Sequence, residues 1–82
     1  MAKIKEGMEI QICSYEEAIN LCNREGELDE NGDMPFYYCD IIPEMFKYFG
    51  TETRVAEFDE DGDAFLAGVP GTWPVKVLKR AK

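Results

Sequence analysis

The sequence contains no histidine, and Ser14 is the only serine among its 82 residues. Histidine is the side chain that most often acts as a base near neutral pH, so catalysis by a Ser-His or Cys-His pair is excluded. Neither of the glycine-rich phosphate motifs, Gly-x-x-x-x-Gly-Lys and Gly-x-Gly-x-x-Gly, is present. These absences predict a protein that is not an enzyme and that needs no cofactor.

Long apolar segments are also missing. No run approaches the ~20 residues needed to cross a membrane, and no apolar segment of the secretory kind follows Lys3 and Lys5. The three cysteines, Cys13, Cys22 and Cys39, are an odd number without Cys-x-x-Cys spacing, which disfavours a disulfide framework. The sequence therefore predicts a cytoplasmic protein whose cysteines are small apolar side chains, with no metal site.

Basic residues are few: 9 lysines and arginines stand against 17 acidic residues, which gives a net charge of −8. Two segments, 25–33 and 57–63, hold five acids each. Nucleic-acid binding depends on cationic side chains that displace counterions from the phosphates, so direct nucleic-acid binding is excluded. A protein partner with a basic surface is favoured instead.

Local patterns in the first half of the chain predict a strand and two helical segments. Residues 8–12 alternate apolar and polar side chains, as a half-buried strand does. Ser14 and Glu17 have the spacing of a capping box, which predicts that a short helix begins there. Pro43 and Gly50 bracket a further short helical turn, with proline at its start and glycine after its end.

The second half predicts strands joined by tight turns. Residues 51–58 and 64–67 have strand composition, and the Asp61-Gly62 pair between them predicts a type I′ hairpin turn. Residues 68–72 predict another turn, and 75–78 predict a short closing strand.

These elements favour a single domain that is mainly β with short helices, an α+β chain. A sheet of short strands in so small a chain leaves few exposed edges if it closes, fully or partly, into a barrel. We therefore expect a closed or partly closed barrel. The side chains expected inside the barrel are Trp73, Phe58, Leu66, Val55, Ile10 and Ile12.

The pentapeptides Asp29–Asp33 (DENGD) and Asp59–Asp63 (DEDGD) suggest either calcium loops or turns. A calcium-binding EF-hand loop requires glycine at position 6 and glutamate at position 12, whereas both copies carry glycine at position 4. That placement favours turns whose carboxylates are solvated and have ordinary pKa values. A calcium-tuned structural component remains an alternative. The acids closest to apolar segments are Asp40 and Glu52. If the protein were a small enzyme, its catalysis would depend on them.

Aromatic residues are concentrated between residues 36 and 49, in larger number than a small core needs. Exposed aromatic side chains anchor many interfaces, and neighbouring charges steer the partner. The side chains predicted to bind a protein partner are, as anchors, Tyr37, Tyr38, Phe46 and Tyr48, and, as steering charges, Asp29, Glu30, Asp59, Glu60 and Asp61.

Three segments, EGMEIQICSYEEA, PEMFKYFGTETRVAEFDEDGDAFLAG and TWPVKVLK, carry a family resemblance. They resemble small SH3-like barrel proteins of uncharacterised phage, prophage and bacterial type. The residues that match that pattern are Gly7, Met45, Tyr48, Gly50, Val55, Phe58, Leu66 and Trp73. Residues 23–40 depart from it and are predicted to be a variable loop or insertion.

The resemblance implies a partly open SH3-like barrel with one inserted N-terminal helix and a helical turn, in a phage-like protein, and it implies no activity. We therefore expect a non-enzymatic module that docks an acidic and aromatic surface on a protein partner. The alternative is a mimic of nucleic acid that inhibits a host defence protein or another nucleic-acid-binding protein.

Overall fold

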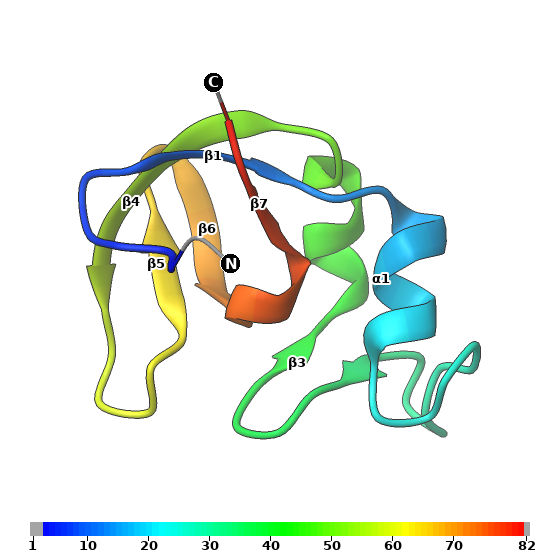
Figure 1. Cartoon of the computed structure of the whole chain (residues 1–82). Helices are drawn as coiled ribbons and strands as arrows, with labels where there is room; N and C mark the ends of the chain where they lie inside the picture. Colours follow the sequence, from blue (N-terminus) through cyan, green and yellow to red (C-terminus); the bar gives the residue numbers. More distant parts are fainter. Residues whose placement is uncertain (1–2, 82) are drawn as a thin grey trace.

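The computed structural model describes residues 3–81 and contains one α-helix, two 3-10 helices and seven short strands. Figure 1 shows their arrangement. In chain order the elements are β1 (Glu9–Ile12), α1 (Tyr15–Leu21), β2 (Met34–Pro35), β3 (Asp40–Ile41), η1 (Pro43–Tyr48), β4 (Glu52–Phe58), β5 (Ala64–Leu66), β6 (Val69–Trp73), η2 (Val75–Val77) and β7 (Leu78–Arg80).

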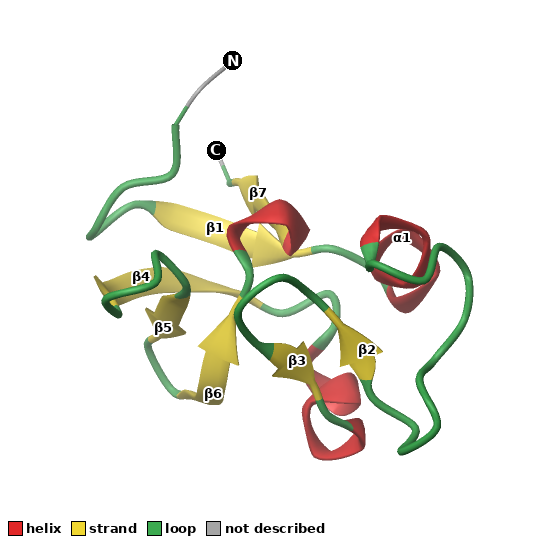
Figure 2. Ribbon diagram, turned by 90° about the horizontal axis from the view of Figure 1, so that it is seen from below, coloured by secondary structure: helices red, strands yellow, loops and turns green. Residues whose placement is uncertain are grey.

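The main sheet has five antiparallel strands in the order β6-β5-β4-β1-β7, and β2 pairs with β3 in a separate two-stranded ribbon. The β1 strand lies between β4 and β7, with Ile10 opposite Thr53 on one side and Arg80 on the other. A bulge between Val55 and Glu57 bends β4 where it pairs with β5. The sheet is curved but open, which confirms the predicted class of a mainly β chain with short helices (Figure 2).

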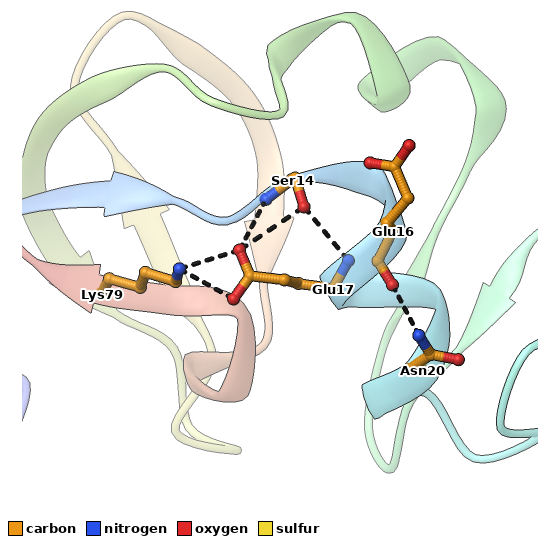
Figure 3. Close-up of polar contacts among 5 residues, drawn as sticks. All are labelled: Ser14, Glu16, Glu17, Asn20 and Lys79. Atoms are coloured by element: carbon orange, nitrogen blue, oxygen red, sulfur yellow. Dashed lines mark hydrogen bonds and ion pairs between the residues drawn. The ribbon is translucent and has the colours of Figure 1, made fainter.

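Helix α1 begins at the predicted capping box. The Glu17 amide donates to Ser14 Oγ at 3.1 Å, and the Ser14 amide donates to Glu17 Oε1 at 3.5 Å. The same glutamate accepts from Lys79 of β7, whose Nζ lies 2.7 Å from Glu17 Oε2 (Figure 3). The hydrogen bond from Lys79 holds the pKa of Glu17 below its ordinary value. One glutamate therefore joins the helix N-terminus to the last strand.

The core lies between the sheet, α1 and η1, and it centres on Trp73, which is fully buried. The indole Nε1 donates to the Pro70 carbonyl at 3.1 Å, and Phe49 packs edge-on against the ring with a centroid distance of 6.0 Å. The other predicted core residues that are buried are Ile10, Ile12, Val55 and Leu66. Phe58 is only half-buried, because it ends β4 at the rim of the sheet beside the acidic turn.

Two predictions near the C-terminus are wrong. Residues 68–72 are not a turn: Val69–Trp73 forms β6, and the turn is confined to Ala67 and Gly68. Residues 75–78 are not one strand, because Val75–Val77 forms η2 after Pro74 and only Leu78–Arg80 pairs with β1. Pairing with β5 extends the strand through residues 69–73, and the chain pairs with β1 only from Leu78 onward.

The predicted variable segment 23–40 contributes to the core. Met34 is fully buried, and Phe36 is 5% exposed. The Asn23 amide donates to the Pro35 carbonyl at 2.8 Å, which fixes the end of α1 against β2. Cys13 and Cys22 are buried and Cys39 is half-buried, all three as free thiols. Within the described residues, every helix is too short and too polar to cross a bilayer.

Replacing Ser14 by alanine should lower the free energy of unfolding by about 1 kcal/mol, because the Glu17 amide loses its capping acceptor. Ser14→Thr keeps a hydroxyl and should lose less than half as much. Urea unfolding of the wild type and the two variants measures both values. Equal stability of the alanine variant and the wild type would show that the capping box does not anchor α1.

Candidate functional site: an acidic edge with a tyrosine hairpin

The two acidic pentapeptides fold into the same loop. In the second acidic loop (residues 59–63), Asp59 Oδ1 accepts from the amides of Asp61 and Asp63, both at 2.9 Å. In the first acidic loop (residues 29–33), Asp29 Oδ1 accepts from the amides of Asn31 and Asp33 at 2.9 and 3.0 Å. The first aspartate of each copy therefore shapes its loop, and the side chains at the second and third positions are exposed.

The second acidic loop is a turn, as predicted, but it is not of type I′. The Gly62 amide donates to the Asp59 carbonyl at 3.1 Å, and Gly62 alone in the loop has a positive φ, of 88°. A type I′ turn requires positive φ at both central residues, whereas here the glycine follows a type I turn. The Asp59 amide donates to the Asp63 carbonyl at 2.8 Å across this three-residue turn, and the Asp59 side chain satisfies the amides of Asp61 and Asp63.

The tip of the β2–β3 ribbon carries Tyr37 and Tyr38, which are 82% and 60% exposed. The Phe36 amide donates to the Cys39 carbonyl at 3.1 Å and closes the tip, so residues 34–41 form a hairpin, here called the tyrosine hairpin. The two tyrosine rings pack against each other with centroids 4.4 Å apart and planes at 61°. Two large aromatic side chains are thus fixed at the most exposed point of the hairpin.

The tyrosine hairpin lies between the two acidic loops. Oxygens of Asp40 lie within 4.8 Å of those of Asp29 and Asp33 in the first loop. On the other side, the Cys39 thiol lies close enough to the Asp63 carboxylate of the second loop for each group to shift the pKa of the other. Consecutive residues of an extended strand point in opposite directions, which explains why Cys39 and Asp40 reach different loops. All three loops project from the same side of the molecule, the lower side in Figure 1; together they are the acidic edge.

No lysine or arginine between residues 3 and 81 forms an ion pair with an acid of the acidic edge. Within residues 3–81, ion pairs join Arg24 to Glu27 and Lys79 to Glu17, and both lie outside the two loops. The pKa of Asp33 is raised, first by burial and then by the negative charges of Asp29, Asp40 and Glu44. The acidic edge therefore carries a concentrated negative potential.

Asp63 departs from the expectation of solvated acids with ordinary pKa values. It is 8% exposed, and its buried Oδ2 has no hydrogen-bond donor among the described residues. Burial raises the pKa of Asp63, while the neighbouring Cys39 thiol partly offsets that rise. The pKa of the Cys39 thiol rises to about 12, first because of burial and then because of the Asp63 charge. The last aspartate of the second acidic loop thus points inward. The sequence did not predict its burial, because the neighbouring acids suggested an exposed position.

The predicted anchors divide into two groups. Tyr37 and Tyr38 are exposed on the acidic edge, whereas Phe46 and Tyr48 of η1 are half-buried and pack against the core. Phe46 contacts the Tyr15 ring at a centroid distance of 5.4 Å, and Tyr48 lies under Lys47 Nζ at 5.5 Å. Among the predicted steering acids, Glu30, Glu60 and Asp61 are exposed, while Asp29 and Asp59 are half-buried in the roles described above.

One group of carboxylates has spacing suited to a hard cation. Among residues 3–81, the acids and cysteines that come together in a set of three are Asp29, Asp33 and Asp40. Sequence reasoning missed this set because Asp40 lies outside the pentapeptide. Exposed acids that hold no ion commonly show the same spacing. In addition, Asp29 Oδ1 already accepts hydrogen bonds from two loop amides.

The acids on which an enzyme would depend do not share a pocket. Asp40 and Glu52 are both exposed. Glu52 lines a shallow open depression with Glu9, Thr53 and Arg54, and Asp40 is not part of it. A buried apolar environment, which would prepare a carboxylic acid for proton transfer, surrounds neither of them.

The acidic edge thus combines two matching loops and one tyrosine hairpin. No family model, curated protein or solved structure matches this chain. The charge, exposure and contacts of the edge residues therefore carry the functional conclusion.

Replacing Asp63 by asparagine should stabilise the protein at neutral pH by about 1 kcal/mol, because a buried charged oxygen without a donor becomes a neutral group. A raised folded-state pKa means that wild-type stability falls as pH rises from the ordinary value of 3.8 through the folded value. The advantage of Asp63→Asn should therefore vanish below pH 3.8. Urea midpoints across pH measure this, with Asp61→Asn as the exposed control. Equal gains from the two variants would contradict the burial argument.

The Asp63 charge should also control the reactivity of Cys39. Removing it in Asp63→Asn lowers the thiol pKa, so alkylation of Cys39 by iodoacetamide at a fixed mildly alkaline pH should accelerate several-fold. Cys13, whose pKa of about 11 comes first from burial and then from Glu17, is the internal control and should keep its rate. Mass spectrometry measures the alkylation rates of the two cysteines. An unchanged Cys39 rate would contradict the effect of the Asp63 charge on the thiol.

Proposed function

We propose that this protein is a non-enzymatic binding module that docks its acidic edge on a protein partner with a basic surface. The observation that carries the proposal is the pair of exposed tyrosines held between two acidic loops whose charges have no cation partner among residues 3–81. Tyrosine contributes large contact area at interfaces at a low entropic cost, because it has few rotatable bonds.

The role of anchor is assigned to Tyr37 and Tyr38 alone. Their rings contact each other and leave most of their surface free for a partner. Phe46 and Tyr48 support η1 from within and offer much less surface. Glu30, Glu60 and Asp61 act as steering charges, since they are exposed and accept no hydrogen bond that shapes the loops.

We infer further that the fold is an SH3-like, partly open barrel of the kind found in phage and prophage proteins. Its support is the element order: an opening strand, a helical turn before β4, the β4–β5 hairpin, and a buried tryptophan before the closing strand. The three free thiols suit a cytoplasmic location.

A second candidate function is mimicry of nucleic acid. The presence of two like-charged loops on one side of the molecule favours it, because a cleft that binds phosphates would meet carboxylates at two separate places. Such binding would weaken strongly with salt and would depend little on the tyrosines. Docking through the tyrosine hairpin would retain part of its affinity at high salt.

Neutralising the exposed loop charges in Glu30→Gln/Glu60→Gln/Asp61→Asn should weaken binding to a basic partner at least tenfold, mainly by slowing association. The matched control, Glu6→Gln/Glu52→Gln/Glu57→Gln, removes as many exposed charges outside the acidic edge and should retain the affinity. Partners captured on the immobilised wild type are compared by surface plasmon resonance with both variants and with Tyr37→Ala/Tyr38→Ala. Equal losses in the two charge variants would refute the acidic edge as the binding surface.

A further inference from the structure

The geometry of the acidic edge points to an arginine-bearing segment as its occupant, with guanidinium groups stacked on the tyrosine rings and paired with the flanking carboxylates. This inference rests on the proposed function and names the chemistry of the partner. It requires aromatic faces that are open, carboxylates without an ion pair inside the protein, and both kinds of group close together.

The tyrosine rings supply the stacking faces. Tyr37 is 82% exposed and Tyr38 is 60% exposed, and their planes meet at 61°, so the two rings face different directions. A guanidinium group is planar and weakly hydrated, and it stacks on aromatic faces more readily than the compact ammonium group of lysine.

The carboxylates lie on both sides of those rings. Asp40 follows the hairpin tip and stands with Asp29 and Asp33, while Cys39 lies near Asp63 in the loop that also carries Glu60 and Asp61. None of these acids has an ion pair with another residue between 3 and 81. A carboxylate can accept two parallel hydrogen bonds from one guanidinium group, which lysine cannot offer.

The presence of an acidic loop on each side sets the shape of the occupant. A single cation can pair with only one loop at a time, whereas an extended segment that crosses the tyrosine hairpin can place an arginine at each. The second contact then forms within the complex and strengthens binding without further area. The occupant is therefore a segment of a basic protein with at least two arginines.

Two synthetic peptides test this inference, one of alternating arginine and alanine and one of alternating lysine and alanine. Their net charge and length are equal, and isothermal calorimetry at moderate salt measures their affinities for the full chain. We expect the arginine peptide to bind about tenfold more tightly, equivalent to ~1.4 kcal/mol. Tyr37→Leu/Tyr38→Leu should abolish that preference, Tyr37→Phe/Tyr38→Phe should retain it, and Glu6→Gln/Glu52→Gln/Glu57→Gln should leave both affinities unchanged.

The possible outcomes separate the inference from the proposed function. Equal affinities for the two peptides, both reduced by Glu30→Gln/Glu60→Gln/Asp61→Asn, would overturn the arginine inference and leave a basic-partner module standing. An arginine preference that survives in the leucine variant would also overturn it, because the rings would not be the source. Binding of either peptide that ignores both the acidic-edge and the tyrosine substitutions would remove the proposed function as well. Far-ultraviolet circular dichroism of each variant confirms that the fold is retained.

Discussion

Each acidic loop depends on one carboxylate oxygen that accepts two backbone amides of the same loop. Asp29 and Asp59 fill this position at closely similar distances, and the glycine three residues later turns the chain back. Because the first aspartate is occupied in this way, the next two side chains are exposed, while the last aspartate is half-buried in the first loop and buried in the second. The exposure of Glu30, Glu60 and Asp61 follows from this arrangement.

The tyrosine hairpin is positioned by its contacts with both loops. Cys39 reaches the second loop and donates to the Thr72 carbonyl at 3.9 Å, while Asp40 reaches the first. Like charges therefore surround a buried carboxyl, Asp63, that has an unpaired oxygen, and both features oppose folding. A partner that brings cations to the acidic edge would offset this cost. Features that destabilise the free protein would then favour the complex.

Local signals in the sequence were sufficient wherever an element is built from its neighbours in the chain. The capping box at Ser14, the alternation of residues 8–12 and the proline and glycine around η1 each predicted the element that forms. They failed for β6, which forms by pairing with β5, and for η2, which precedes the residues that pair with β1. The predicted turn type at Asp61 was wrong because the Asp59 side chain accepts from the Asp61 and Asp63 amides and holds a longer loop.

The acidic edge was predictable only in part. Composition indicated an acidic and aromatic surface, and Tyr37 and Tyr38 are exposed as an anchor must be. Sequence spacing gave no means to separate them from Phe46, which packs against Tyr15 and Phe49. Nor did it show that Asp40 joins Asp29 and Asp33, because that contact links a loop to a strand that follows it by several residues.

The position of the tyrosine hairpin between the two loops is tested most directly by proton–proton distances from nuclear Overhauser effects in the free protein. The structure predicts contacts from Cys39 to Asp63 and Thr72 on one side, and from Asp40 to the first acidic loop on the other. A spectrum in which residues 37–40 contact neither loop, or only one of them, would contradict the account.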